Sequence, residues 1–154
     1  MIEERCPHII HVTRENVTRQ GVSFGYQQLV RQGKLPYHPV HSFRGSRPEP
    51  VIASPKEITA YALKVKREMA QGAARLAAYT GRVLALTYED MVGDRESWLE
   101  PDTGYRIEDF LDVEHIILQV ALRRDFPAPM AEWFANWPEI RAALKAAGLG
   151  GLDG

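Results

Sequence analysis

Three polar residues near the amino end have the types and spacing of an anion site. Arg14 follows the apolar run 9–12, and Arg19 and Ser23 come five and nine positions later. A guanidinium presents a planar fork of N–H donors that matches a phosphate, and a serine hydroxyl adds another donor. Arg19 and Ser23 are four apart and would share one face of a helix. The pattern is typical of phosphate binding, and the simpler alternative is a solvated arginine near a helix start.

The elements around these residues would hold them in place. Residues 9–13 read as a strand, and residues 17–32 have the spacing of a helix that Gly33 ends. The start of a helix offers free backbone N–H groups and the positive end of the helix dipole. A strand that turns into a helix near Arg14 is therefore expected to gather hydrogen-bond donors around an anion.

This stretch resembles the 3′-phosphate-binding segment of sulfotransferases that use 3′-phosphoadenosine 5′-phosphosulfate (PAPS), and it is most similar to the bacterial carbohydrate-type members. From Arg14 to Ser23 it reads Arg-Glu-Asn-x-x-Arg-Gln-x-x-Ser. In that family the strand-end arginine and the helix serine bind the phosphate, so the resemblance implies these roles for Arg14 and Ser23. Arg14 stands about one residue further from the serine than is commonest in the family. Arg19 is therefore kept as an alternative phosphate ligand.

Three later segments follow the order of the same family. Residues 83–91 form an apolar run that ends in Tyr-Glu-Asp-Met, and residues 110–113 read Phe-Leu-Asp-Val, with Asp112 where the family usually has glycine. Residues 136–144 resemble the family's terminal Asn-Trp-x-Glu-Val helix. The resemblance spans about residues 9–147. It implies an α/β fold: a partial P-loop-type parallel sheet flanked by helices, helix-rich overall.

The family's loop for the 5′-phosphosulfate of the donor has no counterpart in this sequence. No Gly-x-x-x-x-Gly-Lys-Ser/Thr pattern occurs, and the glycines at 148–151 read as a helix stop followed by a loose tail, 148–154. We therefore expect the carboxyl-terminal portion of a sulfotransferase. If complete or complemented, it would transfer a sulfuryl group from PAPS to an acceptor hydroxyl. The alternative is a non-catalytic nucleotide-binding or subunit-contact remnant of the fold.

Length and composition bound the classes of protein that fit. The 154 residues suffice for one core, and we expect a single partial sulfotransferase-like domain. Hydrophobic residues make up 45% and charged residues 25%, which is ordinary for a globular protein. No apolar run reaches the roughly 18 residues of a membrane span. The single cysteine excludes an internal disulfide and favours a reducing, cytoplasmic location.

The formal net charge of −1 is unevenly distributed. Residues 1–47 contain seven Lys/Arg and three Asp/Glu, a net charge of +4, whereas residues 48–154 contain twelve and seventeen, a net charge of −5. The basic part holds the predicted phosphate site, as an anionic nucleotide would favour. A chance asymmetry is the simpler alternative. Nucleic-acid binders are usually strongly basic overall, so we expect no nucleic-acid partner.

A proline-rich loop and a long helix follow the first unit. Residues 34–50 contain four prolines and predict an irregular loop, for which we expect contact with the acceptor. Ser54 and Glu57 flank a proline in the pattern of a capping box. An apolar residue every three or four positions then predicts a helix of about 24 residues that ends near Tyr79.

The remaining segments complete an α/β pattern. Residues 83–87 are apolar without alternation and predict a buried parallel strand. One broken or two short helices are expected near 107–120, and Asn136 with Glu139 predicts a capping box for a last helix to about residue 147. Two strands alone do not make a stable sheet. We therefore expect a complementing chain or a homo-oligomer in addition to the nucleotide donor and a hydroxylated acceptor of unknown kind.

Other candidate residues are weaker. His38 or His41 in the proline-rich loop could act as general base for the acceptor hydroxyl, but a solvated histidine is the simpler interpretation, so the catalytic residue is unknown. Histidine pairs alone are too few ligands for a metal centre, and we expect no metal. Glu89 and Asp90 follow the second strand, and we interpret both as structural, positioning the next segment.

Overall fold

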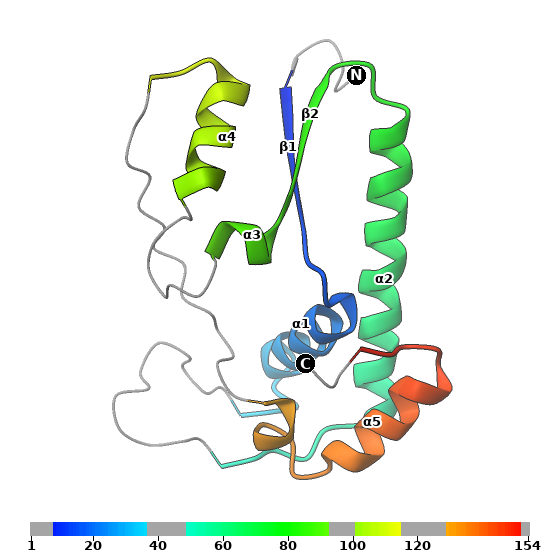
Figure 1. The fold of residues 1–154 in the computed structure, drawn as a ribbon. Coiled ribbons are helices and arrows are strands. Elements are labelled where there is room, and N and C mark those ends of the chain that lie inside the picture. Colours follow the sequence, from blue (N-terminus) through cyan, green and yellow to red (C-terminus); the bar gives the residue numbers. More distant parts are fainter. Residues whose placement is uncertain (1–7, 37–48, 93–100, 115–128, 152–154) are drawn as a thin grey trace. The chain divides into compact units, whose positions relative to one another are not determined.

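The computed structural model describes residues 8–36, 49–92, 101–114 and 129–151 (Figure 1). The chain divides into two compact units, residues 1–15 with 69–124 and residues 16–68 with 125–154. The elements are, in order, β1 (His8–Thr13), α1 (Val17–Arg31), α2 (Pro55–Ala77), β2 (Arg82–Thr87), α3 (Tyr88–Val92), α4 (Pro101–Leu111), a 3₁₀ helix (Met130–Glu132) and α5 (Trp137–Ala146).

Two parallel strands form the sheet of the first unit. β1 and β2 pair in register, with His8 beside Arg82 and Thr13 beside Thr87 (Figure 1). Parallel strands need a long crossover, and here the chain passes through α1 and α2 between them. The fold is thus α/β and rich in helix. The predicted pair of parallel strands is confirmed, with boundaries within one residue of the expected ones.

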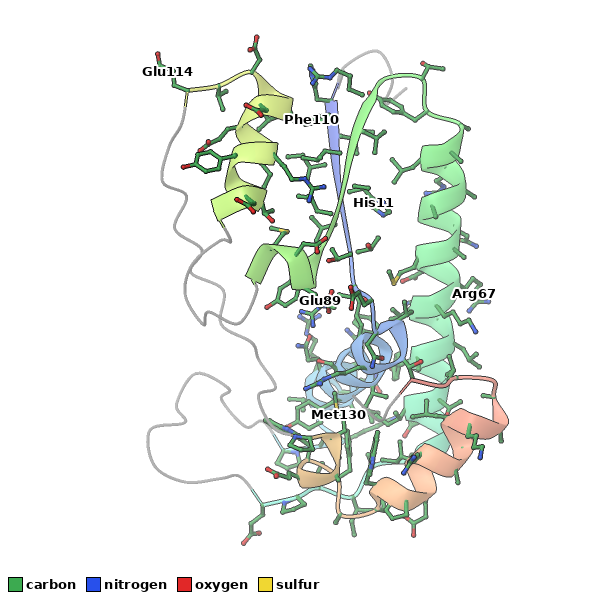
Figure 2. All side chains as sticks on the ribbon, in the orientation of Figure 1. His11, Arg67, Glu89, Phe110, Glu114 and Met130 are labelled. Carbon is green, nitrogen blue, oxygen red and sulfur yellow. The ribbon has the colours of Figure 1, made fainter. Side chains whose placement is uncertain are left out.

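Helix α4 packs on one face of this sheet through Phe110. The Phe110 ring meets the His8 ring edge-on at a centroid distance of 5.3 Å, and the Arg82 guanidinium lies 4.9 Å from the Phe110 centroid. Figure 2 shows Phe110 pointing from α4 toward the strands. His11 lies on the opposite face from His8, because side chains alternate along a strand.

The sheet is covered less completely than the sequence predicts. Of the predicted buried strand, residues 83–87, only Leu86 is buried, and Val83 is 38% exposed. Val12 in β1 is 45% exposed. The expectation of a fully buried strand is therefore wrong for this chain. The physical reason is that the described part of the chain forms a sheet of two strands with few neighbours on its faces, whereas parallel sheets in larger folds carry helices on both faces.

The second unit is held together by a close crossing of α1 and α2. Gly21 of α1 lies so near α2 that an added Cβ would stand 2.5 Å from the Cα of Ala62. At Gly25, one turn later, the same atom would stand 3.2 Å from side-chain atoms of Ile58 and Tyr61. The absence of a side chain at these two positions lets the helix backbones approach and bury Ile58 and Ala62 completely.

One hydrophobic core fills the second unit. A short parallel bridge joins Val51 to Phe134, with the Val51 N–H donating to the Trp133 carbonyl at 2.9 Å. The Tyr26 ring packs edge-on against the rings of Trp133 and Phe134. The core includes Val22, Tyr26, Leu29, Leu35, Val51, Ala53, Ile58, Ala62, Met130, Trp133, Phe134, Ile140, Leu144 and Leu149.

The two predicted capping boxes have different outcomes. The Ser54 hydroxyl oxygen accepts the Glu57 N–H at 3.3 Å, so the helix start is confirmed, while the Glu57 carboxylate pairs with Lys34. At α5 the expectation is wrong, because Asn136 makes no side-chain cap. Its amide instead accepts the Ala53 N–H at 3.1 Å and donates to the Ala53 carbonyl at 2.8 Å. This tertiary clasp uses both ends of the amide.

The described part of the glycine-rich end, residues 148–151, is held in place by the second unit. Gly148 has a φ of +70° and ends α5, as predicted, and the Leu149 N–H donates to the Leu144 carbonyl at 3.0 Å. The expected loose tail is wrong for these residues, because Leu149 is only 2% exposed. The Thr18 hydroxyl donates to the Gly150 carbonyl at 2.8 Å, and the Asn16 amide donates to that of Gly151. The buried Leu149 and these two hydrogen bonds therefore hold residues 149–151 against the start of α1.

Two threonine-to-valine substitutions should have different effects on stability. Thr18→Val removes the bond to Gly150 from a site that is 6% exposed and should lower the free energy of unfolding by about 1 kcal/mol. Thr59→Val is the matched control, since the buried Thr59 hydroxyl has no hydrogen-bond partner within the described chain. That change should leave stability unchanged or raise it. Chemical denaturation of both variants tests this, and equal losses would contradict it.

Candidate functional site

Arg14 stands at the carboxyl end of β1, beside the carboxyl end of β2. The strands are in register at Thr13 and Thr87, so Arg14 and Tyr88 are the first residues after two neighbouring strands. The Arg14 guanidinium carbon lies 3.8 Å from the centroid of the Tyr88 ring. Stacking uses the face of the guanidinium, whereas hydrogen bonds to a phosphate use the N–H groups in its plane. The contact therefore fixes the orientation of the donor fork and is compatible with an anion.

Two hydrogen bonds tie the carboxyl ends of β1 and β2 together. The Thr13 hydroxyl donates to the Leu86 carbonyl at 3.3 Å, and the Glu15 N–H donates to the Glu89 carboxylate at 3.2 Å. Figure 2 places Glu89 at the strand end where the sheet meets α3. These bonds define the backbone on both sides of Arg14. The Glu89 carboxylate also brings a negative charge to this edge of the sheet, and that charge opposes the binding of an anion. The attraction for an anion here would therefore come from the Arg14 guanidinium.

Asp90 has a structural role. Its N–H donates to the Thr87 hydroxyl at 2.9 Å, and its carboxylate accepts the Thr87 N–H at 3.1 Å, which is a reciprocal capping box at the start of α3. The Thr103 hydroxyl donates to the Asp90 carbonyl at 2.9 Å and links α3 to α4. Hydrogen bonding by the Thr87 side chain, and next by its backbone, lowers the pKa of Asp90, and the charge of Arg106 acts in the same direction.

The capping box should make the stability of the first unit depend on acid pH. Because folding lowers the pKa of Asp90, its carboxylate contributes fully above the ordinary Asp pKa of about 3.9 and loses that contribution as the pH falls through the lower folded value. Asp90→Ala removes the carboxylate that accepts the Thr87 N–H, so it should lower the free energy of unfolding near neutral pH, and this loss should shrink in acid. Chemical denaturation of the original chain and the variant across the pH range measures this. A loss that is constant across the pH range would contradict it.

Arg19 and Ser23 lie on α1 in the second unit. The Arg19 N–H in the first turn donates to the Asn16 side-chain oxygen at 2.8 Å, so an asparagine cap already satisfies that group. Ser23 lies half-buried about one turn further along α1. The Asn16 amide and the Thr18 hydroxyl donate to the tail carbonyls. Hydrogen-bond acceptors of the protein itself therefore already lie at the first turn of α1, beside the predicted phosphate ligand Arg19.

Sequence reasoning missed two features of this region. Tyr88 was part of a strand-end motif with no role of its own, yet it is the side chain that orients Arg14. The available signal was its position, because Tyr88 follows one parallel strand as Arg14 follows the other. The contact of Asn16 and Thr18 with the tail had no local signal, since the partners are more than 130 residues apart in sequence.

Some candidates lie elsewhere or outside the described residues. His38 and His41 fall in the segment 37–48, which is outside the description, and so does most of the predicted acceptor loop. Within the described ranges there is no group of three or more His, Cys, Asp or Glu side chains that could hold a metal ion. The candidate site that the structure describes consists of Arg14, Tyr88 and the neighbouring carboxylates of Glu89 and Asp90.

No protein family, curated protein or solved structure matches this chain. None of the described helices is both long enough and apolar enough to cross a membrane.

Proposed function

We propose that the chain is a sulfotransferase-like protein of P-loop type that binds PAPS through its 3′-phosphate and transfers the sulfuryl group to an acceptor hydroxyl. In that reaction the acceptor oxygen attacks sulfur, the bond from sulfur to the 5′-phosphate oxygen breaks, and a base takes the acceptor proton. Arg14 would hold the far end of the donor and supply positioning, not bond-making. The acceptor class and the base are left open.

The observation that carries the proposal is the setting of Arg14. Ligands of open parallel sheets bind at the carboxyl ends of the strands, and Arg14 stands there with its guanidinium stacked 3.8 Å over the Tyr88 ring. A side chain held in this way loses less conformational entropy when it binds an anion than a free arginine does. The Arg14 guanidinium is therefore suited to bind the 3′-phosphate of a nucleotide donor.

A second observation agrees with the family pattern. Asp112 stands where the family usually has glycine, and it has a φ of +54° at the end of α4. That left-handed conformation favours glycine, and aspartate is among the few other residues that adopt it with modest strain. The backbone at Asp112 thus has a conformation for which glycine would be suited. The backbone conformation at Asp112 therefore supports the resemblance to the family, although the aspartate side chain differs from the family's glycine.

The non-catalytic alternative is favoured by the first turn of α1. The Arg19 N–H is capped by Asn16, and the Asn16 amide and the Thr18 hydroxyl face tail carbonyls, which are acceptors like the phosphate itself. Under this alternative the chain binds nucleotide or a partner subunit and does not turn over.

Calorimetry and turnover separate the two. Under both nucleotide-binding readings, titration with 3′-phosphoadenosine 5′-phosphate (PAP) should give saturable heat, and 5′-AMP, which lacks the 3′-phosphate, should bind more weakly. Sulfur-labelled PAPS with sugar, lipid and small-alcohol acceptors then measures transfer. Labelled product supports the enzyme, and PAP binding without product supports the remnant. Absence of PAP binding, alone and with a complementing fragment, would overturn both nucleotide-binding readings and leave the subunit-contact remnant.

A further inference from the structure

Helix α4 presents two aspartates and an aromatic side chain, while the exposed Arg106 beside them donates to a carbonyl of β2 at 3.4 Å. Asp102, Tyr105 and Asp109 lie at positions i, i+3 and i+7 of the helix, and all three are exposed. Tyr105 is 52% exposed, while Phe110 of the same helix is buried. The face therefore combines apolar contact area with negative charge.

Helix α2 presents a face of opposite character. Lys56, Ala60, Leu63 and Arg67 lie at i, i+4, i+7 and i+11, and all four are exposed. Leu63 is 41% exposed, while Ile58, Ala62 and Val65 of the same helix are buried. Figure 2 shows Arg67 on the side of α2 that faces away from α1. This face joins an apolar centre to positive charges.

The charges of the two units follow the same division. Residues 1–15 and 69–124 contain eight Lys/Arg and thirteen Asp/Glu, a net charge of −5. Residues 16–68 and 125–154 contain eleven and seven, a net charge of +4. A chain with one acidic and one basic unit carries both halves of an electrostatically complementary pair, so a second copy of the same chain is the partner that matches both faces at once.

The spacing of the two faces also agrees. In each, a charged residue follows the apolar one by four positions, about 6 Å along the helix axis. One alignment therefore places Leu63 against Tyr105 and Arg67 beside Asp109. We infer that the α4 face of one copy docks on the α2 face of a second copy in this alignment. The contact is head-to-tail, because different surfaces of the two copies meet.

Sedimentation of the full chain tests the inference. At an ionic strength of about 0.01 M, where the Debye length is about 30 Å, the average mass should rise with concentration above that of the 17.4 kDa monomer. At about 1 M salt, where the Debye length is about 3 Å, it should return toward the monomer. A chain that stays monomeric at every concentration and ionic strength would overturn the inference.

A charge exchange identifies the residues. Arg67→Glu or Asp109→Arg alone places like charges together and should lower the association constant at least about tenfold. An equimolar mixture of the two variants should associate again, and so should the double variant R67E/D109R, whose net charge equals that of the original chain. Restored association also shows that the variants are folded.

Arg31→Glu in the last turn of α1 is the matched control, because it changes the net charge as Arg67→Glu does but lies outside the α2 face. It should leave association near the level of the original chain. Equal weakening by Arg31→Glu, or a double variant that fails to associate, would overturn the pairing of Arg67 with Asp109. These measurements need no nucleotide, so their outcome is independent of the proposed activity.

Discussion

Gly21→Ala should lower the free energy of unfolding by about 1–3 kcal/mol, in the range typical of overpacked helix contacts. The added Cβ would stand 2.5 Å from the Cα and 2.9 Å from the Cβ of Ala62, closer than non-bonded carbon atoms approach. Backbone, and not the end of a flexible side chain, must move to admit it. The loss should appear even though alanine is the better helix former by about 1 kcal/mol. Urea denaturation measures the change.

Gly72→Ala is the matched control for this prediction. Gly72 lies in the interior of α2, and an added Cβ there would have no neighbouring atom within 4 Å. Only helix propensity acts at this site, so the variant should gain up to about 1 kcal/mol. Opposite signs at the two glycines are the expected result. If both substitutions stabilise the chain, the close crossing of α1 and α2 is wrong.

Arg14→Ala should weaken PAP binding about 10- to 100-fold. Hydrogen bonds that involve charged groups contribute about 1.5–3 kcal/mol, and a tenfold change in affinity corresponds to about 1.4 kcal/mol. Because the proposal assigns Arg14 to the 3′-phosphate, the same change should hardly alter the affinity for 5′-AMP. The preference for PAP over 5′-AMP should therefore shrink in the variant. Calorimetric titration of both proteins with both nucleotides gives this difference directly.

Three further variants separate orientation from charge. Arg75→Ala removes an exposed arginine in the last turn of α2 and should leave PAP binding unchanged. Tyr88→Phe keeps the ring under Arg14 and should bind PAP nearly as the original chain does. Tyr88→Leu removes the ring and should weaken binding. If Arg75→Ala and Arg14→Ala weaken PAP equally, the effect is one of net charge and not of a site.

The elements of the fold were predictable where local patterns are strong. Periodic apolar residues and the Ser54 cap predicted α2, whose observed bounds, Pro55–Ala77, differ little from the expected ones. The apolar runs of β1 and β2 predicted two parallel strands, and the structure pairs them in parallel. These signals depend on residues within a few positions of one another, which is why sequence alone conveys them.

Contacts between residues that are distant in the sequence could not be predicted from such local patterns. Asn136 has the sequence of a helix cap but clasps Ala53, because an amide can satisfy a distant backbone as well as its own helix. Leu149 looked like part of a loose tail but is buried, since a single leucine next to a helix stop carries no periodicity. The burial of β2 was overestimated for a related reason, because coverage of a strand depends on elements elsewhere in the chain.

The site was predictable in part. Arg14 was identified from its place after a strand, and the structure adds the ring of Tyr88, which depends on the register of two strands about 75 residues apart. Arg19 and Ser23 were identified from helical spacing, and they do lie on α1. Their role in phosphate binding stays a prediction, because no contact in the described part of the chain tests it. The cap by Asn16 and the tail contacts could not be read from helical spacing.

The most direct test of the central claim is a crystal structure of the chain with PAP. We expect the 3′-phosphate at the carboxyl end of β1, with guanidinium nitrogens of Arg14 about 2.7–2.9 Å from its oxygens and the Tyr88 ring still stacked against the guanidinium. A 3′-phosphate bound at other residues, with the Arg14 guanidinium out of hydrogen-bonding reach, would contradict it.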